Sequence, residues 1–87
     1  MNEDRKFFKG ILDGVEKELE VLFTFRSNKT NKDYIIYTDN LFSNDSLNIY
    51  ASIYYPEEPN RELEKIRENS DWNEVELFLK EVGLNGN

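Results

Sequence analysis

The sequence contains no cysteine and no histidine. Disulfides, thiolate nucleophiles, Ser-His and Cys-His catalytic pairs and the usual zinc and iron sites are therefore excluded. Its apolar runs are only a few residues long, whereas a membrane-spanning helix needs about 20, and the start of the chain does not have the pattern of a signal peptide. Since small secreted domains usually depend on disulfides, we expect a cytoplasmic protein that makes no contact with membranes.

Positive charge is also scarce. The chain has 11 Lys and Arg against 18 Asp and Glu, for a net charge of −7. An acidic domain repels phosphate backbones and anionic lipid surfaces, so we expect no direct binding to nucleic acid. Another protein, or a second copy of this chain, is left as the expected partner.

The residues that are present suffice for one core. A chain of 87 residues is long enough for one domain and too short for two. Six Phe, five Tyr and one Trp supply large side chains for burial. We therefore predict a single domain over residues 1–87, ordered over about 6–84.

The N-terminal part contains an ambiguous segment. Residues 7–12 are rich in apolar side chains and precede Asp13-Gly14, a pair typical of two-residue type I′ turns. The same residues also have the spacing of a helix face, although Gly10 and Gly14 would each cost about 1 kcal/mol inside a helix. We prefer strand, turn and strand. The choice between this arrangement and a helix stays open for residues 6–15.

Three further strands are predicted, at residues 18–26, 34–39 and 47–55. Side chains alternate between two faces in the first and the last, and the middle one is rich in β-branched and aromatic residues. In the first, alternation places Leu19, Val21, Phe23 and Phe25 on one face and Glu20, Leu22, Thr24 and Arg26 on the other. In the last, Leu47, Ile49, Ala51, Ile53 and Tyr55 alternate with Asn48, Tyr50, Ser52 and Tyr54. Residues 40–45 are expected to form a loop, and residues 63–66 form either a short strand or a helical turn.

A C-terminal helix is predicted over residues 70–82. Ser70 is the expected N-cap, and Gly83 fits the left-handed position after the last turn, with Leu84 touching Leu79. The apolar stripe consists of Trp72, Val75, Phe78, Leu79 and Val82. The expected fold class is α+β: an antiparallel meander of three to four strands with a C-terminal helix packed on one face.

Carboxylates and amides are the remaining candidates for chemistry, and we interpret them as structural. The alternating Glu16, Glu18 and Glu20 fit a solvated strand face. The oxygen-rich segment 39–48 does not have the spacing of a calcium loop, so we read it as turns. We read the acidic stretch 57–64 as solvated. The sequence therefore predicts no catalytic, cofactor-binding or metal-binding residue, no cofactor and no enzyme.

Aromatic side chains give the one candidate interaction surface. Tyr50 and Tyr54 are expected on the face opposite the helix, with Leu22 and one of Tyr34 or Tyr37, and we select Tyr37. An aromatic patch on an open sheet face is suited to binding another protein. The alternative is that the N-terminal segment or Leu41-Phe42 covers this patch.

The predicted strands and helix also resemble a known family. Segments 21–25, 34–39 and 49–54, together with Leu63, Ile66 and the segment Asp71-Trp72-Asn73-Glu74-Val75-Glu76, are similar to the DUF1292 family over about residues 11–82. Asn73 stands where that family is expected to carry an acidic residue. The resemblance implies a short cytoplasmic bacterial protein of unassigned activity, often encoded beside a nuclease that resembles Holliday-junction resolvases.

Together these observations predict a small acidic protein-interaction module without catalytic activity. Self-association through a sheet edge or the tyrosine face is one form of it. An acidic adaptor or regulator of a nucleic-acid-processing protein is the alternative, and an enzyme is the third hypothesis.

Overall fold

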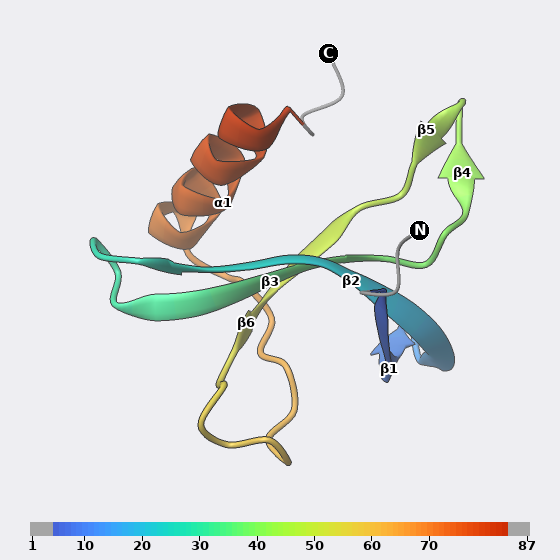
Figure 1. Cartoon of the computed structure of the whole chain (residues 1–87), viewed down its shortest axis with the longest axis horizontal. Coiled ribbons are helices and arrows are strands. Elements are labelled where there is room, and N and C mark those ends of the chain that lie inside the picture. The colour runs from blue at the N-terminus through green and yellow to red at the C-terminus, as the bar shows by residue number, and fades with distance from the viewer. Residues whose placement is uncertain (1–4, 84–87) are drawn as a thin grey trace.

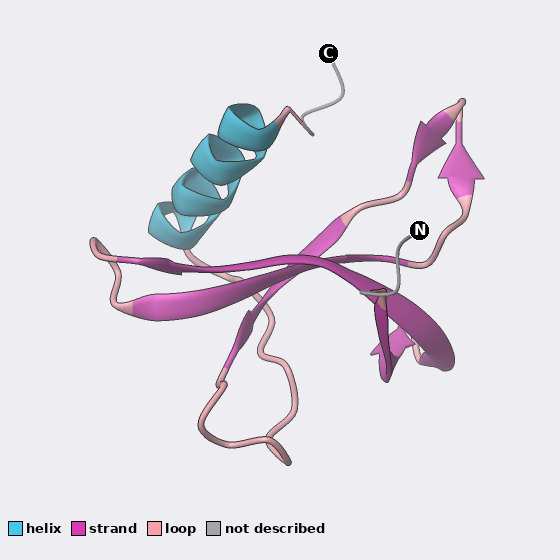
Figure 2. Cartoon of the chain, in the orientation of Figure 1, coloured by secondary structure: helices cyan, strands magenta, loops and turns pink. Residues whose placement is uncertain are grey.

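The computed structural model describes residues 5–83, which form a four-stranded antiparallel sheet with one helix on one face (Figures 1 and 2). The strands lie in the order β1-β2-β3-β6, and a separate two-stranded sheet pairs β4 with β5. The elements are β1 (Lys6–Leu12), β2 (Val15–Ser27), β3 (Lys32–Thr38), β4 (Phe42–Ser43), β5 (Ser46–Leu47), β6 (Tyr50–Tyr54) and α1 (Asn69–Val82). The predicted α+β meander with a C-terminal helix is confirmed.

A tight hairpin joins β1 to β2, so the strand interpretation of residues 6–15 is confirmed. Asp13 has φ 53° and Gly14 has φ 79°, the positive values that a two-residue type I′ turn requires. The turn closes on the pair Leu12 and Val15, and the pairing continues without a shift to Lys6 and Val21.

An irregularity in β2 changes which side chains point to the helix. The pairing of β2 with β3 shifts between Val21 and Phe23, as at a β-bulge. Leu19 and Val21 consequently pack on the side away from α1, whereas Phe23 packs on the helix side. The predicted common face for Leu19, Val21, Phe23 and Phe25 is therefore wrong, because one extra residue inverts the alternation.

The helix-side core lies between the sheet and α1. Its buried members are Tyr34, Ile36, Ile53, Ile66 and Val75. Phe78 of α1 stacks on Phe25 with ring centroids 4.1 Å apart and meets Phe23 edge-on at 5.5 Å. These contacts place α1 across β2, β3 and β6.

The N-cap of the helix differs from its prediction, whereas the C-terminal end agrees with it. Glu68 is the N-cap and makes no side-chain capping bond, so the predicted cap at Ser70 is wrong. Gly83 has φ 79° and its N–H donates to the carbonyls of Leu79 and Lys80, which confirms the predicted left-handed end. The predicted contact of Leu84 lies outside the described residues.

The apolar stripe of α1 is also rotated. Trp72 is 41% exposed, whereas Asp71 is 1% exposed. Asp71, Val75 and Leu79 are spaced by four residues and share the inward side. Trp72 therefore does not belong to the core, contrary to the predicted stripe, because Asp71 occupies the inward position of the first turn.

The segment before β6 forms a small hairpin instead of a loop. Asn44 and Asp45 have φ 53° and 68° between β4 and β5. Leu47 pairs with Phe42 in this hairpin, so the strand predicted from residue 47 begins only at Tyr50. The reading of Asn44 and Asp45 as turn residues is confirmed.

Residues 63–66, predicted as either a short strand or a helical turn, form a short extended segment. Glu64 forms an isolated bridge with Ile53, and Ile66 is buried in the helix-side core. Over residues 5–83 the only helix is α1, and it is neither long nor apolar enough to cross a membrane.

Candidate functional site

A buried polar contact joins β3 to α1. The hydroxyl of Tyr34 donates a hydrogen bond of 2.6 Å to Asp71, and Lys32 Nζ lies 3.1 Å from the same carboxylate. The hydroxyl of Thr30 lies 2.7 Å from that of Tyr34, whose single proton is directed to Asp71. Because Tyr34 and Asp71 are almost fully buried, this contact fixes the rotation of the helix on the sheet.

The ionisation of this contact follows from its burial. Burial first, and then donation to Asp71, raise the pKa of Tyr34 to about 12. The hydrogen bond to Asp71 is the main reason why the pKa of Lys32 is raised above its ordinary value. At neutral pH the hydroxyl therefore stays a donor and the amine stays charged, which is the state that satisfies the buried carboxylate.

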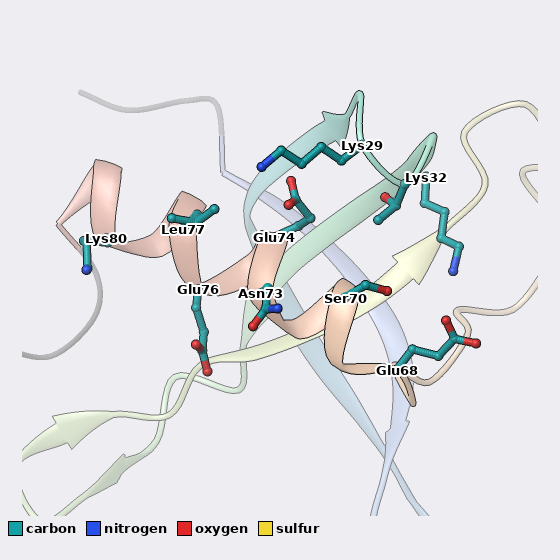
Figure 3. Close-up of a pocket in the computed structure, with 10 residues that line it drawn as sticks. Lys29, Lys32, Glu68, Ser70, Asn73, Glu74, Glu76, Leu77 and Lys80 are labelled. Carbon is teal, nitrogen blue, oxygen red and sulfur yellow. The ribbon is translucent and has the colours of Figure 1, made fainter.

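A shallow groove of about 790 Å³ lies above this contact, between the β2–β3 turn and α1 (Figure 3). Figure 3 shows Lys29 and Lys32 on the side of the β2–β3 turn, and the glutamates on the side of α1. Next to the groove, the hydroxyl of Ser27 donates to Glu74 at 2.8 Å and accepts from the backbone N–H groups of Lys29 and Thr30. The lining residues are Lys29, Thr30, Lys32, Glu68, Ser70, Asn73, Glu74, Glu76, Leu77 and Lys80.

The groove presents charged side chains and few groups that could react with a substrate. Ser27 is 5% exposed and its hydroxyl is engaged in shaping the turn, so it is not placed to attack a substrate. Among residues 5–83, no three acidic side chains come together in a group that could hold a metal ion. Two polar contacts at the groove, Ser27 with Glu74 and Lys32 with Asp71, join the sheet to α1.

The tyrosine side of the sheet forms a second core. Tyr37 is 6% exposed, stacks beside Tyr50 at 5.8 Å, and meets Phe8 edge-on at 5.5 Å. Its hydroxyl lies 2.8 Å from that of Ser52. The N-terminal segment named as one alternative thus packs on this side, through Phe8 and Leu12.

The four residues predicted as an interaction surface do not share one surface. Tyr37, Tyr50 and Tyr54 belong to the second core, and Tyr50 and Tyr54 keep partial exposure. Leu22 packs instead with the helix-side core, so its predicted place beside the tyrosines is wrong. The shift in β2 is the cause, since it changes the side to which residues near position 22 point.

A charged cluster ties the start of β1 to the segment before β4. Glu20 accepts two bonds of 2.8 Å from Arg5 and one of 3.2 Å from Asn40. The bonds from Arg5, together with that from Asn40, outweigh burial and lower the pKa of Glu20 to about 2. Glu20 is only 9% exposed, so the prediction of a solvated face is wrong for this glutamate.

The two edges of the sheet differ. On β6, Ile53 and Glu64 exchange two backbone hydrogen bonds of 2.8 and 2.9 Å, which occupy that edge at Ile53. On β1, no second strand pairs with the outer side within the described part of the chain. Figure 1 shows β1 at the margin of the sheet that is away from α1. β1 is therefore the open edge.

The turn geometry defines which backbone groups of β1 are open. A two-residue hairpin loop closes on a hydrogen-bonded pair, here Leu12 and Val15. Because hydrogen-bonded and outward residues alternate along an antiparallel strand, the N–H and C=O groups of Phe7, Lys9 and Ile11 point away from β2. These three residues form the open edge of β1.

The open edge also carries exposed apolar side chains. Phe7 is 46% exposed and Ile11 is 66% exposed. Phe7 and Ile11 share a face of β1 with Lys9. On β2, Phe7 lies opposite Glu20, Lys9 opposite Glu18 and Ile11 opposite Glu16. The sequence prediction did not single out Phe7 or Ile11 as binding residues. Two signals point to them: the first strand of an open meander lies at an edge of the sheet, and their alternation with Lys9 places all three on one face of that strand.

The fold and these features define a small antiparallel meander with one edge bridged at Ile53 and one open edge, β1. Comparison with known proteins gives the family. A UPF0473 protein of Bacillus pumilus is 37% identical over 70 residues, which is 77% of this chain and 74% of that protein. A UPF0473 protein of Leuconostoc mesenteroides is 37% identical over 71 residues, 76% of this chain and 72% of that protein.

This chain belongs to the UPF0473 family of bacterial proteins. No family model matches the chain. No solved structure matches it either. The name of the family states no activity, so a function has to be argued from the surface.

Proposed function

We propose that the protein is a non-catalytic protein-interaction module that binds through the open edge of β1. One observation carries the proposal: unpaired backbone groups and two exposed apolar side chains, Phe7 and Ile11, lie together on one strand. The opposite edge, on β6, is occupied at Ile53 by a backbone bridge to Glu64. An exposed edge strand favours pairing with another strand unless it is protected.

The binding mode would be strand addition. An added strand forms main-chain hydrogen bonds with the open groups of Phe7, Lys9 and Ile11, while its side chains contact Phe7 and Ile11. The main chain supplies affinity and the two apolar side chains supply selectivity. Within residues 5–83, no buried polar side-chain atom of the network around Asp71 lacks a hydrogen-bond partner, which supports a structural role for this network.

The experiment is photo-cross-linking in the bacterium that encodes the chain. A photoreactive amino acid replaces Ile11, and in a matched control it replaces Leu77, which is 50% exposed on α1. We expect discrete protein adducts from position 11 and none above background from position 77. Equal adducts from both positions, or no adduct from position 11, would contradict the proposal.

An acidic adaptor for a basic partner is the second candidate. It is supported by the net charge of −7 and by the exposed carboxylates of Glu57, Glu58 and Glu62 in the segment after β6. Such binding would weaken steeply between low and moderate salt, because exposed charges are screened over about 10 Å at 0.1 M. Binding to the nuclease that the family resemblance suggests as a neighbour, measured against salt, tests this. Failure to bind at low salt would exclude it.

Family membership and cellular location can also be proposed for this chain. We propose that the chain is also a member of the DUF1292 family, on the resemblance of its strands and of the segment 71–76. We propose further that it works in the cytoplasm, because small secreted domains usually depend on disulfides and this chain contains no cysteine. Fractionation of cells that express the tagged chain tests the second statement.

A further inference from the structure

We infer that the partner at the open edge is a second copy of this chain, paired antiparallel β1 to β1 with the two Lys9 residues opposite each other. This rests on the proposed function of the β1 edge and adds the identity of its occupant. The pairing would join two four-stranded sheets into one continuous sheet. Backbone complementarity, side-chain complementarity and register each support it.

The backbone of the open edge is self-complementary. The outward residues Phe7, Lys9 and Ile11 are spaced evenly around Lys9. Antiparallel pairing around a twofold axis at Lys9 places Phe7 opposite Ile11 of the other copy, and Lys9 opposite Lys9. Each of these pairs exchanges both of its backbone bonds, so every outward N–H and C=O group of the three residues finds a partner.

The side chains also match in this register. Phe7 and Ile11, which are 46% and 66% exposed in the single chain, become cross-strand neighbours and remove each other from water. On the other side of the sheet, Phe8 comes opposite Gly10, which has no side chain to collide with it.

Neighbouring registers match less well. A shift that places Phe8 opposite Phe8 sets Phe7 against Lys9 and leaves Ile11 opposite Arg5. A shift that places Gly10 opposite Gly10 sets Phe7 against Asp13. Both shifts separate Phe7 from Ile11, so the apolar contact selects the register centred on Lys9.

The central lysines are the one unfavourable pair. Like charges that face each other across strands are destabilising. Each Lys9 nevertheless lies opposite Glu18 of its own β2, so each of the two lysines has a carboxylate on its other side. The repulsion limits affinity without preventing association, and it makes Lys9 a sensitive position for a test.

A cysteine test reports the register directly, since the natural chain contains no cysteine. In Lys9→Cys the two Cα atoms would lie about 5.5 Å apart, within the range of a disulfide. In the control Ile11→Cys they would be offset by four residues, or about 13 Å. We expect rapid disulfide dimers from Lys9→Cys under mild oxidation and slow ones from Ile11→Cys.

A proline test reports the backbone bonds. Lys9→Pro and Lys9→Ala both remove the charge, but only proline removes the outward N–H, and an edge strand tolerates proline on its solvent side. By sedimentation over a wide range of concentration, we expect Lys9→Ala to dimerise at least as tightly as the natural chain. Lys9→Pro should be weaker than Lys9→Ala by about tenfold or more. Far-ultraviolet circular dichroism of both variants checks that they are folded.

The outcomes separate the two proposals. Equal affinities of folded Lys9→Pro and Lys9→Ala, or equal oxidation rates of the two cysteine variants, would overturn self-pairing at β1. A chain that stays monomeric at every concentration would overturn it too, while cross-links from position 11 to a different protein would still support the interaction module. If Lys9→Pro does not fold, the cysteine pair alone decides the inference.

Discussion

The hydroxyl of Tyr34 on β3 donates a hydrogen bond of 2.6 Å to the carboxylate of Asp71 on α1. Both side chains are almost completely buried, and Lys32 completes the contact from the margin of the groove. A buried carboxylate has to be paired and hydrogen-bonded to be tolerated. The contact therefore links the rotation of the helix to one position on the sheet.

Removing the hydroxyl of Tyr34 should destabilise the fold. Tyr34→Phe keeps the ring and leaves Asp71 with Lys32 as its remaining hydrogen-bond donor. A hydrogen bond to a charged group contributes about 1.5–3 kcal/mol, and we expect a loss of that size in the free energy of unfolding measured with urea. The control Tyr54→Phe removes a hydroxyl on the other side of the sheet and should change stability little. Equal losses would contradict a special role for the Asp71 contact.

Glu20 should make the fold sensitive to acid. Its pKa is lowered from 4.5 to about 2, first by the hydrogen bonds from Arg5. The unfolded chain thus takes up this proton before the folded chain does, so the stabilisation is complete above pH 4.5 and is lost as pH falls toward 2. Unfolding free energies across this range should fall less steeply in Glu20→Gln than in the natural chain, and parallel curves would be the opposing result.

Substitutions of two aromatic residues should show which face of α1 is packed on the sheet. Phe78→Ala removes a ring stacked on Phe25 and is expected to cost about 3 kcal/mol. Trp72→Ala removes a side chain that is 41% exposed and should cost less than 1 kcal/mol. Urea denaturation followed by circular dichroism compares the two. A larger loss for Trp72→Ala would show that the helix packs in another rotation.

Gly83 should be required for the end of α1 by its backbone alone. It has φ 79°, and a Cβ atom added there would meet no atom within 4 Å among the described residues. Gly83→Ala is therefore expected to lose about 1 kcal/mol from conformational strain without any steric contact. Thermal unfolding measures the effect, and an unchanged midpoint would mean that the helix can end in another conformation.

Local patterns were enough to predict most elements. Asp13-Gly14 indicated the first hairpin, because few residue pairs accept two positive φ angles, and Gly83 indicated the end of the helix for the same reason. Ile49, Ala51 and Ile53 alternated as predicted because β6 is regular and covered on both faces. The N-cap residue was not predictable, since Glu68 caps the helix without any side-chain bond that a motif could reveal.

The candidate sites depended on contacts between distant residues. Lys32, Tyr34 and Asp71 are nearly 40 positions apart at the extremes, so no local spacing announces that their polar groups meet. Leu22 was placed on the wrong side because a shift in pairing is a property of two strands together. The pairing of Glu20 with Arg5 and Asn40 similarly required the hairpin to be folded.

The sequence by itself determined the α+β class, the turn at Asp13-Gly14 and the extent of the helix to within a residue at its N-terminal end, because backbone preferences and hydrophobic periodicity act between near neighbours. Tertiary structure alone decided which face of each strand is inside, which first-turn residue of α1 is buried, and which edge of the sheet stays open. Those outcomes are set by the packing of β1, β2 and α1 against elements far away in the chain, where one bulge or one buried carboxylate outweighs local preference.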